Sequence, residues 1–177
     1  MNEFDRQTEF KKSFPEISAL LSESDIVRLL NISQRVEFSA GRKIIKDLQP
    51  VEHLYMVLSG KLEAVVDDGN QEKVVGVIGA GEIIGEVSLL SGAMTASSSV
   101  VTASKVVALK MSHQAFTIML NDGDHLANIV LQHLVIRLER RLESARERLL
   151  KISESGANQK RSANAGGLLS MLLGLRY

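Results

Sequence analysis

The spacing of hydrophobic and polar residues changes along this chain of 177 residues. From Phe10 to about Asn31, the apolar positions follow a helical period, and the stretch SESDIVRLL places Ile26, Leu29 and Leu30 on one face. Ser22 or Ser24 precedes this run as a candidate N-cap residue, with Asp25 in the first turn. The pattern predicts a short helix that packs against the rest of the domain.

From Arg35 to Met111 the chain changes to brief runs rich in β-branched residues, separated by glycines and by the Asp-Asp-Gly sequence at 67–69. Short strands that follow each other without helices pair in an antiparallel manner, as in a sandwich, a jelly roll or a barrel. The predicted strands are RVEF, RKIIK, LYMVL, KLEAVV, EKVVGVI, SSSVVT and KVVALKM.

A single long helix is predicted from Asp124 to about Glu154. Its apolar residues step alternately by four and by three positions, which gives a period of about 3.5 and favours a partner helix, most simply that of a second copy. The remaining face is mostly basic but is interrupted by acidic residues, so it is expected to be solvated. The predicted dimer interface consists of Leu131, Val135, Leu138, Leu142, Ala145, Leu149 and Ile152.

The last part of the chain joins a polar linker to the apolar stretch LLSMLLGLRY, from Leu168 to Tyr177. This stretch is far shorter than the roughly 20 residues that a membrane span needs. We expect it to dock on this domain, on the twin subunit or on another protein. Peripheral membrane contact is less favoured, because Arg176 is its only basic residue.

Composition narrows the classes of function. Lys and Arg together number 21, as do Asp and Glu, so no net charge attracts nucleic acid or an anionic membrane. The chain has no cysteine and no signal peptide pattern at its beginning, which predicts a cytoplasmic protein. Its four histidines lack metal-ligand spacing, and His125 and His133 are expected to be surface or half-buried groups. No catalytic set emerges, so we predict a protein that is not an enzyme.

The stretch GEIIGEVSLLSGAMTASSSVV, from Gly81 to Val101, contains the candidate binding segment. A turn at Gly79-Ala80-Gly81 precedes a short helix predicted to begin near Gly85, and a helix N-terminus can hold an anion on its free amides. A glycine at this place lets a ligand approach the backbone. Glu86 in the first turn can accept hydrogen bonds from a ligand hydroxyl such as a ribose.

Several spaced motifs give the chain its resemblance to a known family. The segment RVEFSAGRKIIKDLQPVEHLYMVLSGKLEAV, followed by GEIIGEVSLLSG, resembles the cyclic nucleotide-binding domain of catabolite activator regulators and of cyclic-nucleotide-dependent kinase regulatory subunits. The resemblance implies a jelly-roll β-barrel flanked by N-terminal helices and a long C-terminal dimerisation helix, hence a mainly β fold with helices. It also implies a ligand site at Gly85, Glu86, Val87, Ala96, Ser97 and Ser98, with cAMP or cGMP as the possible ligand.

The sequence departs from the family at its basic residue. The family places Arg-Ser or Arg-Ala about ten residues after the Gly-Glu pair, and its arginine binds the cyclic phosphate. Here that position falls on Ala96, or on Thr95 in an alignment shifted by one, while Ser97 matches the following small residue. Lys73 or Lys105 from a neighbouring strand is a candidate substitute. The family's base-capping residues cannot be aligned securely; Arg141 and Leu142 stand near their expected place.

Two functions remain open. In the first, the chain is a regulatory domain with weakened cyclic nucleotide affinity that acts as a homodimeric protein-interaction module. In the second, it still senses a cyclic nucleotide or another small molecule through amides, Glu86 and Ser97. DNA binding is not expected, because a helix-turn-helix domain would need more chain than follows the long helix. The predicted organisation is an N-terminal helical segment (1–34), a β-roll (35–112) whose binding segment is 81–99, C-terminal helices (113–155), and a linker with the apolar tail (156–177).

Overall fold

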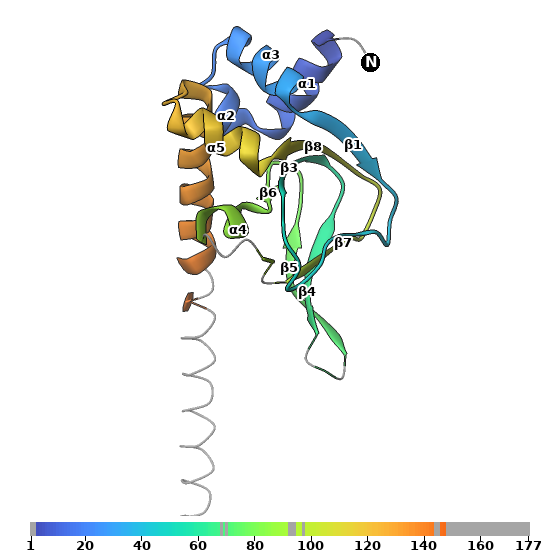
Figure 1. Ribbon diagram of the computed structural model, residues 1–177. Helices are drawn as coiled ribbons and strands as arrows, with labels where there is room; N and C mark the ends of the chain where they lie inside the picture. The colour runs from blue at the N-terminus through green and yellow to red at the C-terminus, as the bar shows by residue number, and fades with distance from the viewer. Residues whose placement is uncertain are drawn as a thin grey trace, which may run out of the picture. The chain divides into compact units, whose positions relative to one another are not determined.

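The computed structural model describes residues 3–67, 69, 71–91, 95–96, 98–143 and 146–147. The chain divides into two compact units, residues 1–134 and 135–177. The first unit carries the helices and the β-roll discussed below (Figure 1).

Three helices open the chain, which confirms the N-terminal helices that the family resemblance implied; the hydrophobic period alone had predicted one short helix. They are α1 (Glu3–Ser13), α2 (Pro15–Ser18) and α3 (Glu23–Ile32). The missed helices carry weak local signals, because α1 is strongly polar and buries only Phe10. The N-cap of α3 is Ser22 and not Ser24: its hydroxyl accepts a hydrogen bond from the Asp25 amide at 3.1 Å, and its own amide donates to the Asp25 carboxylate at 3.2 Å.

Two four-stranded antiparallel sheets form the predicted jelly roll, in the orders β1-β8-β3-β6 and β2-β7-β4-β5. This confirms the fold expected from the spacing of the short strands. The strands are β1 (Gln34–Phe38), β2 (Lys43–Ile45), β3 (His53–Ser59), β4 (Leu62–Asp67), β5 (Glu72–Ile78), β6 (Ile83–Ile84), β7 (Ser99–Thr102) and β8 (Val106–Ser112).

The first sheet is covered on both faces, which explains its unbroken apolar runs. Along β3, Leu54, Met56 and Leu58 belong to an apolar cluster shared with the helices, whereas Tyr55 and Val57 belong to a second cluster inside the roll. The second sheet contributes only one face to the interior cluster, through residues such as Leu62 and Val100. Its edge strand β5 is consequently exposed over most of its length.

After β8, helix α5 (His113–Asn121) starts from the N-cap Ser112. A further helix over residues 125–143 begins after Asp124, whose carboxylate accepts hydrogen bonds from the amides of Leu126 and Ala127 at 2.9 and 3.3 Å. Asp124 also pairs with Arg28 of α3. The first turns of this helix pack into the cluster shared with the helices through Leu126, Ala127, Ile129, Val130 and Leu134.

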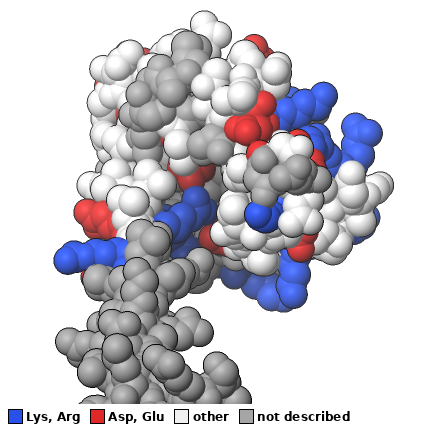
Figure 2. All heavy atoms as spheres, turned by 90° about the horizontal axis from the view of Figure 1, so that it is seen from below, with Lys and Arg blue, Asp and Glu red and all other residues white. Residues whose placement is uncertain are grey.

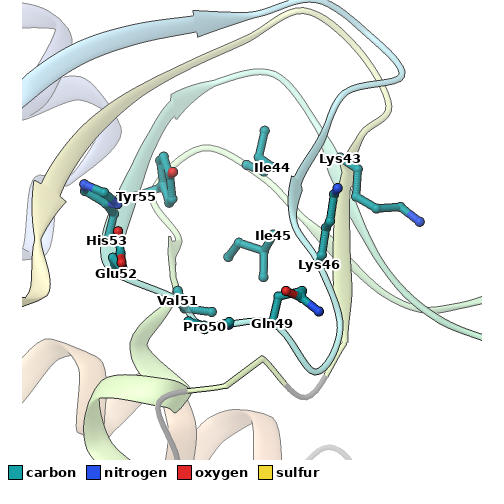
Figure 3. Close-up of a pocket in the computed structure, with 10 residues that line it drawn as sticks. All are labelled: Lys43, Ile44, Ile45, Lys46, Gln49, Pro50, Val51, Glu52, His53 and Tyr55. Atoms are coloured by element: carbon teal, nitrogen blue, oxygen red, sulfur yellow. The ribbon is translucent and has the colours of Figure 1, made fainter.

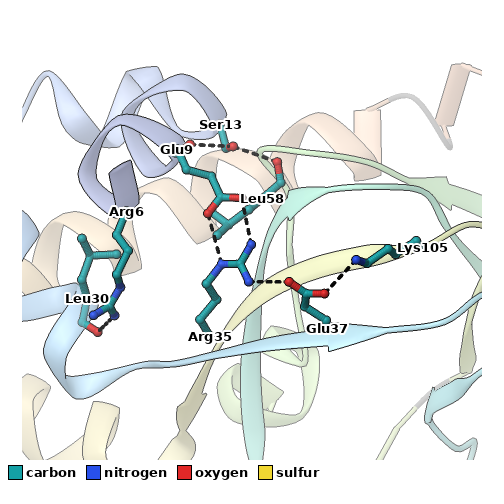
Figure 4. Close-up of polar contacts among 8 residues, drawn as sticks. All are labelled: Arg6, Glu9, Ser13, Leu30, Arg35, Glu37, Leu58 and Lys105. Atoms are coloured by element: carbon teal, nitrogen blue, oxygen red, sulfur yellow. Dashed lines mark hydrogen bonds and ion pairs between the residues drawn. The ribbon is translucent and has the colours of Figure 1, made fainter. Parts of the chain in front are cut away.

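Charged side chains attach the N-terminal helices to the roll (Figure 4). Arg35 of β1 donates to Glu9 of α1 at 3.2 Å and to Glu37 at 2.6 Å, and Lys105 lies 2.8 Å from the other Glu37 oxygen. Ser13 donates to the carbonyl of Leu58 at 2.8 Å. Lys105 first and Arg35 second hold the pKa of the Glu37 carboxyl at about 2. We call Glu9, Arg35, Glu37 and Lys105 the ionic ladder.

Candidate functional site

The binding segment is held against strand β3. Its strand β6 pairs with Tyr55 and Met56, and the pairing continues through Gly81, whose amide donates to the Val57 carbonyl at 2.9 Å. Helix α4 (Glu86–Ser91) follows at once, as predicted from the sequence. The side chains of Ile83 and Ile84 enter opposite apolar clusters, so both sides of the segment are fixed.

Gly85 makes a close backbone contact between the binding segment and strand β3. Its φ is +91°, and a Cβ at this position would lie 2.3 Å from the carbonyl oxygen of His53. The sequence suggested that this glycine admits a ligand to the backbone. The structure shows a requirement internal to the fold, because the chain must pass close to the start of β3 before α4 can begin.

The two carboxylates of the segment have different surroundings. Glu82 accepts a hydrogen bond from the Gly79 amide at 2.7 Å and thereby closes the turn before β6. Glu86, the predicted ribose-binding residue, is only 4% exposed at the start of α4. Glu86 therefore lies in the first turn of α4, as the sequence predicted, whereas Glu82 supports the turn before β6.

Ala96, the residue that the sequence analysis aligns with the family's arginine, is buried. It is 7% exposed and belongs to the apolar cluster inside the roll, together with Ile45, Val51 and Tyr55. Its amide donates to the Gln49 carbonyl at 3.0 Å, and its carbonyl accepts from the Leu48 amide at 3.1 Å. The side chain of Ala96 is thus a methyl group inside the roll, and its backbone is hydrogen-bonded to the β2–β3 loop.

The other predicted ligand contacts are only partly described. Val87 is 39% exposed on α4, and Ser98 is half-buried just before β7. Ser97 lies outside the described residues. Ser99, which the sequence analysis did not select, accepts a hydrogen bond from the Asp47 amide at 3.0 Å.

Two hollows adjoin the β2–β3 loop. The smaller has a volume of about 300 Å³ and is drawn in Figure 3. The larger, of about 810 Å³, extends toward β4 and β5 and includes Val65, Asp67 and Glu72. Lys43, Lys46 and Gln49 line both. The described lining of the smaller hollow is Lys43, Ile44, Ile45, Lys46, Gln49, Pro50, Val51, Glu52, His53 and Tyr55.

The lysines near the site are not those that the sequence suggested. Lys105 is engaged with Glu37 in the ionic ladder, and neither Lys105 nor Lys73 is among the described residues that line the hollows. Lys43 lines both hollows but lies 2.7 Å from a carboxylate oxygen of Glu72. Lys46 forms no ion pair with another described residue. Sequence reasoning missed Lys46 because its proximity to Ala96 depends on long-range pairing.

Two histidines lie beside Gly85. Burial is the main cause that lowers the pKa of His53 and of His113, so both imidazoles are neutral at pH 7. His125 is exposed, as expected, whereas His133 is buried at 8% exposure with Nδ1 3.7 Å from Glu16. The prediction that His133 is a surface or half-buried group was therefore wrong, because α2 covers that part of the helix.

The predicted dimer interface is partly described. Leu131 packs against the apolar cluster shared with the helices, so this position serves its own domain. Val135 and Leu142 are 44% and 71% exposed, and Leu138 is half-buried. Ala145, Leu149, Ile152 and the tail from Leu168 to Tyr177 lie outside the described residues.

The described residues were compared with the requirements of a membrane span, a metal site and a charged binding surface. No helix among them is long and apolar enough to cross a bilayer. In the same part of the chain, no three His, Cys, Asp or Glu side chains gather as a metal ion would require. On the face shown in Figure 2, basic and acidic side chains are interspersed, and no extended patch of one sign stands out among the described residues.

Comparison with known proteins agrees with the fold. The family described as cyclic nucleotide-binding domain matches residues 35–122. A CRP-like cAMP-activated global transcriptional regulator of Mycobacterium tuberculosis is 28% identical over 120 residues, which are 66% of this chain and 52% of the regulator. The chain thus spans about half the length of the curated relatives it matches.

Solved structures show the same architecture. A cyclic nucleotide-binding domain from Methylobacillus flagellatus aligns with a TM-score of 0.71 at 23% identity, over 81% of this chain and 84% of that domain. A mutant regulatory subunit of a cAMP-independent protein kinase A from Trypanosoma brucei, bound to cAMP in its A site, aligns with a TM-score of 0.58 at 25% identity. That alignment covers 74% of this chain and 47% of the subunit.

These findings define the class of the protein. The chain belongs to the cyclic nucleotide-binding domain family, a typically non-catalytic regulatory module, with that domain at residues 35–122. Its relatives include both CRP-like regulators and protein kinase A regulatory subunits.

Proposed function

We propose that this chain is a non-enzymatic signalling domain that has lost most of its affinity for cyclic nucleotides and acts as a homodimeric protein-interaction module. The observation that carries the proposal is Ala96, a buried methyl group at the position where the family has its phosphate-binding arginine. A cyclic nucleotide placed here would bring a negative charge against hydrocarbon.

The size of the expected loss follows from the electrostatics of a buried ion pair. Removing one partner of such a pair typically costs about 2–5 kcal/mol. This corresponds to an affinity lower by about 30-fold to several thousandfold. A site of micromolar affinity would become roughly sub-millimolar or weaker.

A relative supports the assignment of the lost affinity to this position. The Trypanosoma brucei regulatory subunit is described as cAMP-independent, and the mutant that was solved with cAMP has, among three substitutions, arginine in place of a threonine and alanine in place of a valine. An Arg-Ala pair is also one of the two forms that the family uses after its Gly-Glu pair. The same reasoning predicts that an arginine at position 96 raises the affinity of this chain for cAMP.

The dimeric part of the proposal is supported by the exposed leucine and valine of the long helix. Val135 and Leu142 are 44% and 71% exposed, and an apolar side chain that remains in water favours association with a similar surface. Leu142→Glu is expected to convert the dimer into a monomer in sedimentation equilibrium. Glu139→Gln, an exposed position on the same helix, should leave the dimer intact.

A second function is favoured by one observation, the burial of Glu86. A carboxylate that is 4% exposed beside a binding segment suits a receptor that still uses it for a ligand hydroxyl. In this case the domain senses a cyclic nucleotide, or a different small molecule, through backbone amides, Glu86 and Ser97.

Titration calorimetry and thermal unfolding with cAMP and cGMP distinguish the two functions. The first function predicts no measurable stabilisation of the wild type at 1 mM ligand, whereas a ligand at about 100 times its dissociation constant would add about 2.7 kcal/mol. The matched variant Ala96→Arg should bind cAMP measurably. Tight binding of either nucleotide by the wild type would contradict the proposed loss of affinity.

A further inference from the structure

The outer edge of the second sheet carries apolar side chains that the rest of the domain does not cover. Strand β5 ends the order β2-β7-β4-β5 and pairs with β4 and with no other described strand. Among the described strands, only β5 has large apolar side chains that are exposed: Val74, Val75 and Val77 are 54%, 54% and 64% exposed. We propose that this edge pairs in antiparallel direction with β5 of a second copy of the chain, which joins two sheets into one.

The other edges of the two sheets are protected in ways that β5 is not. The strands β2 and β6 have only three and two residues, and β1 carries paired charges of the ionic ladder. Short edge strands and charged side chains are common means by which proteins prevent edges from pairing. β5 has seven residues, and its charged side chains, Glu72 and Lys73, both lie at its start. The rest of the strand combines an open backbone edge with exposed valines.

A β-bulge contributes to the apolar outer face of β5. The pairing with β4 skips Val75, which is an extra residue without a partner on that strand. Val77 follows two positions later, and neither valine belongs to the apolar cluster inside the roll, whereas Ile78 does. Alternate residues of a strand point to the same face. Val75 and Val77 therefore lie together on the outer face.

The sequence of β5 is self-complementary when two copies pair about Gly76. In this antiparallel register, Val75 of each copy lies opposite Val77 of the other, and the two-fold axis produces this valine pair twice. Directly opposed β-branched side chains stabilise neighbouring strands. A second copy thus matches the exposed valines of the first with valines of its own.

The charged residues fit the same register. Lys73 lies opposite Gly79 of the other copy, and the amide of Gly79 donates to the Glu82 carboxylate at 2.7 Å. The pairing therefore brings a cation of each copy toward a carboxylate of the other. Glu72 lies 2.7 Å from Lys43 of its own chain, so its charge is already matched. An unrelated strand would have to reproduce both the apolar and the charged positions, which a second copy supplies by symmetry.

The contact is expected to be weak. Stable protein interfaces usually bury about 1,200–2,000 Å², and a single pair of seven-residue strands lies below this range. We therefore expect a dissociation constant of roughly 0.1–1 mM. The inference goes beyond the proposed function, because β5 lies in the first unit and the contact needs neither the long helix nor any change in cAMP affinity.

Sedimentation velocity of the full chain tests the association. The background is Leu142→Glu, which removes the association proposed for the long helix, so that the protein is a monomer at low micromolar concentration and self-associates toward about 1 mM. Val77→Lys should raise the dissociation constant about tenfold or more, since a lysine on an edge strand blocks pairing. Ile118→Lys, at a position on α5 that is 52% exposed, is the matched control and should leave the association unchanged. Thermal unfolding of both variants checks that each is folded.

A charge reversal and a crosslink test the register. Lys73→Glu should weaken the association about 2- to 5-fold, as expected for the loss of an exposed ion pair. The chain has no cysteine, so Val75→Cys and Val77→Cys each introduce a single thiol. Because the two positions lie opposite each other across the axis, a mixture of the two variants oxidised by glutathione disulfide should crosslink about threefold faster than either variant alone.

The inference is overturned if the Leu142→Glu background shows no association at about 1 mM, if Val77→Lys and Ile118→Lys associate alike, or if either cysteine variant alone crosslinks as fast as the mixture. Amide exchange adds a further outcome. Protection of β5 that rises with protein concentration supports the pairing, whereas protection independent of concentration would show that a segment of the same chain covers the edge.

The proposed function is tested separately, through cAMP and Ala96→Arg and through the effect of Leu142→Glu on the wild-type dimer. A failure of β5 to pair leaves both of these results intact. Tight cAMP binding by the wild type, in turn, does not account for a difference between Val77→Lys and Ile118→Lys.

Discussion

The ionic ladder and the binding segment differ in their charged side chains: the first consists of paired charges, whereas the second is apolar at Ala96. In the ladder, Arg35 lies between Glu9 and Glu37, and Glu37 also meets Lys105, so each charge has a partner (Figure 4). In the binding segment, the buried Ala96, which the sequence analysis aligns with the family's arginine, offers only a methyl group. The backbone of that segment nevertheless keeps close contacts at Gly85. The comparison teaches that the requirements of the fold and those of the ligand rest on different residues and can be lost separately.

The largest effect should come from the backbone of the binding segment. Gly85→Ala places a Cβ 2.3 Å from the His53 carbonyl oxygen at a φ of +91°, and we expect a loss of about 3 kcal/mol or more in the free energy of unfolding. Gly79→Ala is the control, because its Cβ would meet nothing within 4 Å, and it should cost less than about 1 kcal/mol. Urea denaturation measures both. Equal losses would show that the segment is not constrained at Gly85.

The next largest loss of stability is expected from substitution of Ala96. Ala96→Arg inserts a long side chain at a site that is 7% exposed, so we expect a loss of about 1–3 kcal/mol without ligand, and partial recovery with cAMP. Leu48→Arg is the matched control at a neighbouring position that is 76% exposed, where the same side chain should change stability by less than about 0.5 kcal/mol. If the two variants are equally stable, the roll already has room for the guanidinium.

A smaller loss in the free energy of unfolding is expected when the ionic ladder is broken. Arg35→Met removes the hydrogen bonds to Glu9 and Glu37 from a side chain that is 27% exposed, and should cost about 1–2 kcal/mol in urea denaturation. Lys43→Met breaks the more exposed pair with Glu72 and should cost less than about 0.5 kcal/mol. A larger loss for Lys43→Met would contradict the assignment of the ladder as the stabilising group of charges.

The smallest effect is a change in pH dependence. The pKa of Glu37 falls from 4.5 to about 2 on folding, so its contribution is present above the unfolded value and is lost as pH falls toward the folded value. Glu37→Gln should therefore flatten the decline of the thermal midpoint between pH 4.5 and pH 2. Glu3→Gln, which forms no ion pair with another described residue, should keep the wild-type slope. High salt should narrow the difference between Glu37→Gln and wild type, because screening weakens exposed pairs.

Local sequence patterns predicted much of the fold. The β-branched runs gave the strands of the jelly roll, the Ser22 and Asp25 pair gave the cap of α3, and the Gly-Glu pair gave the start of α4 at Glu86. Each of these features depends on neighbours in sequence. The hydrophobic period did not single out α1, because its pattern is mostly polar and it is held by distant partners such as Leu58.

The candidate site was less predictable for the same physical reason. The sequence identified Ala96 as a departure from the family, yet it could not show that the β2–β3 loop pairs with this residue. It offered Lys105, which long-range pairing places beside Glu37, and passed over Lys46. The direction of a side chain depends on strand register and loop path, which no local period encodes.

The two backbone hydrogen bonds between Ala96 and the β2–β3 loop join segments that are far apart in the chain. Neither segment can open alone without leaving an amide or a carbonyl group unsatisfied. The amide protons of Leu48 and Ala96 should therefore exchange with deuterium at similar rates, as members of one local unfolding unit. A molecule that displaces the loop would thus also break the backbone hydrogen bonds of Ala96, a residue of the apolar cluster inside the roll.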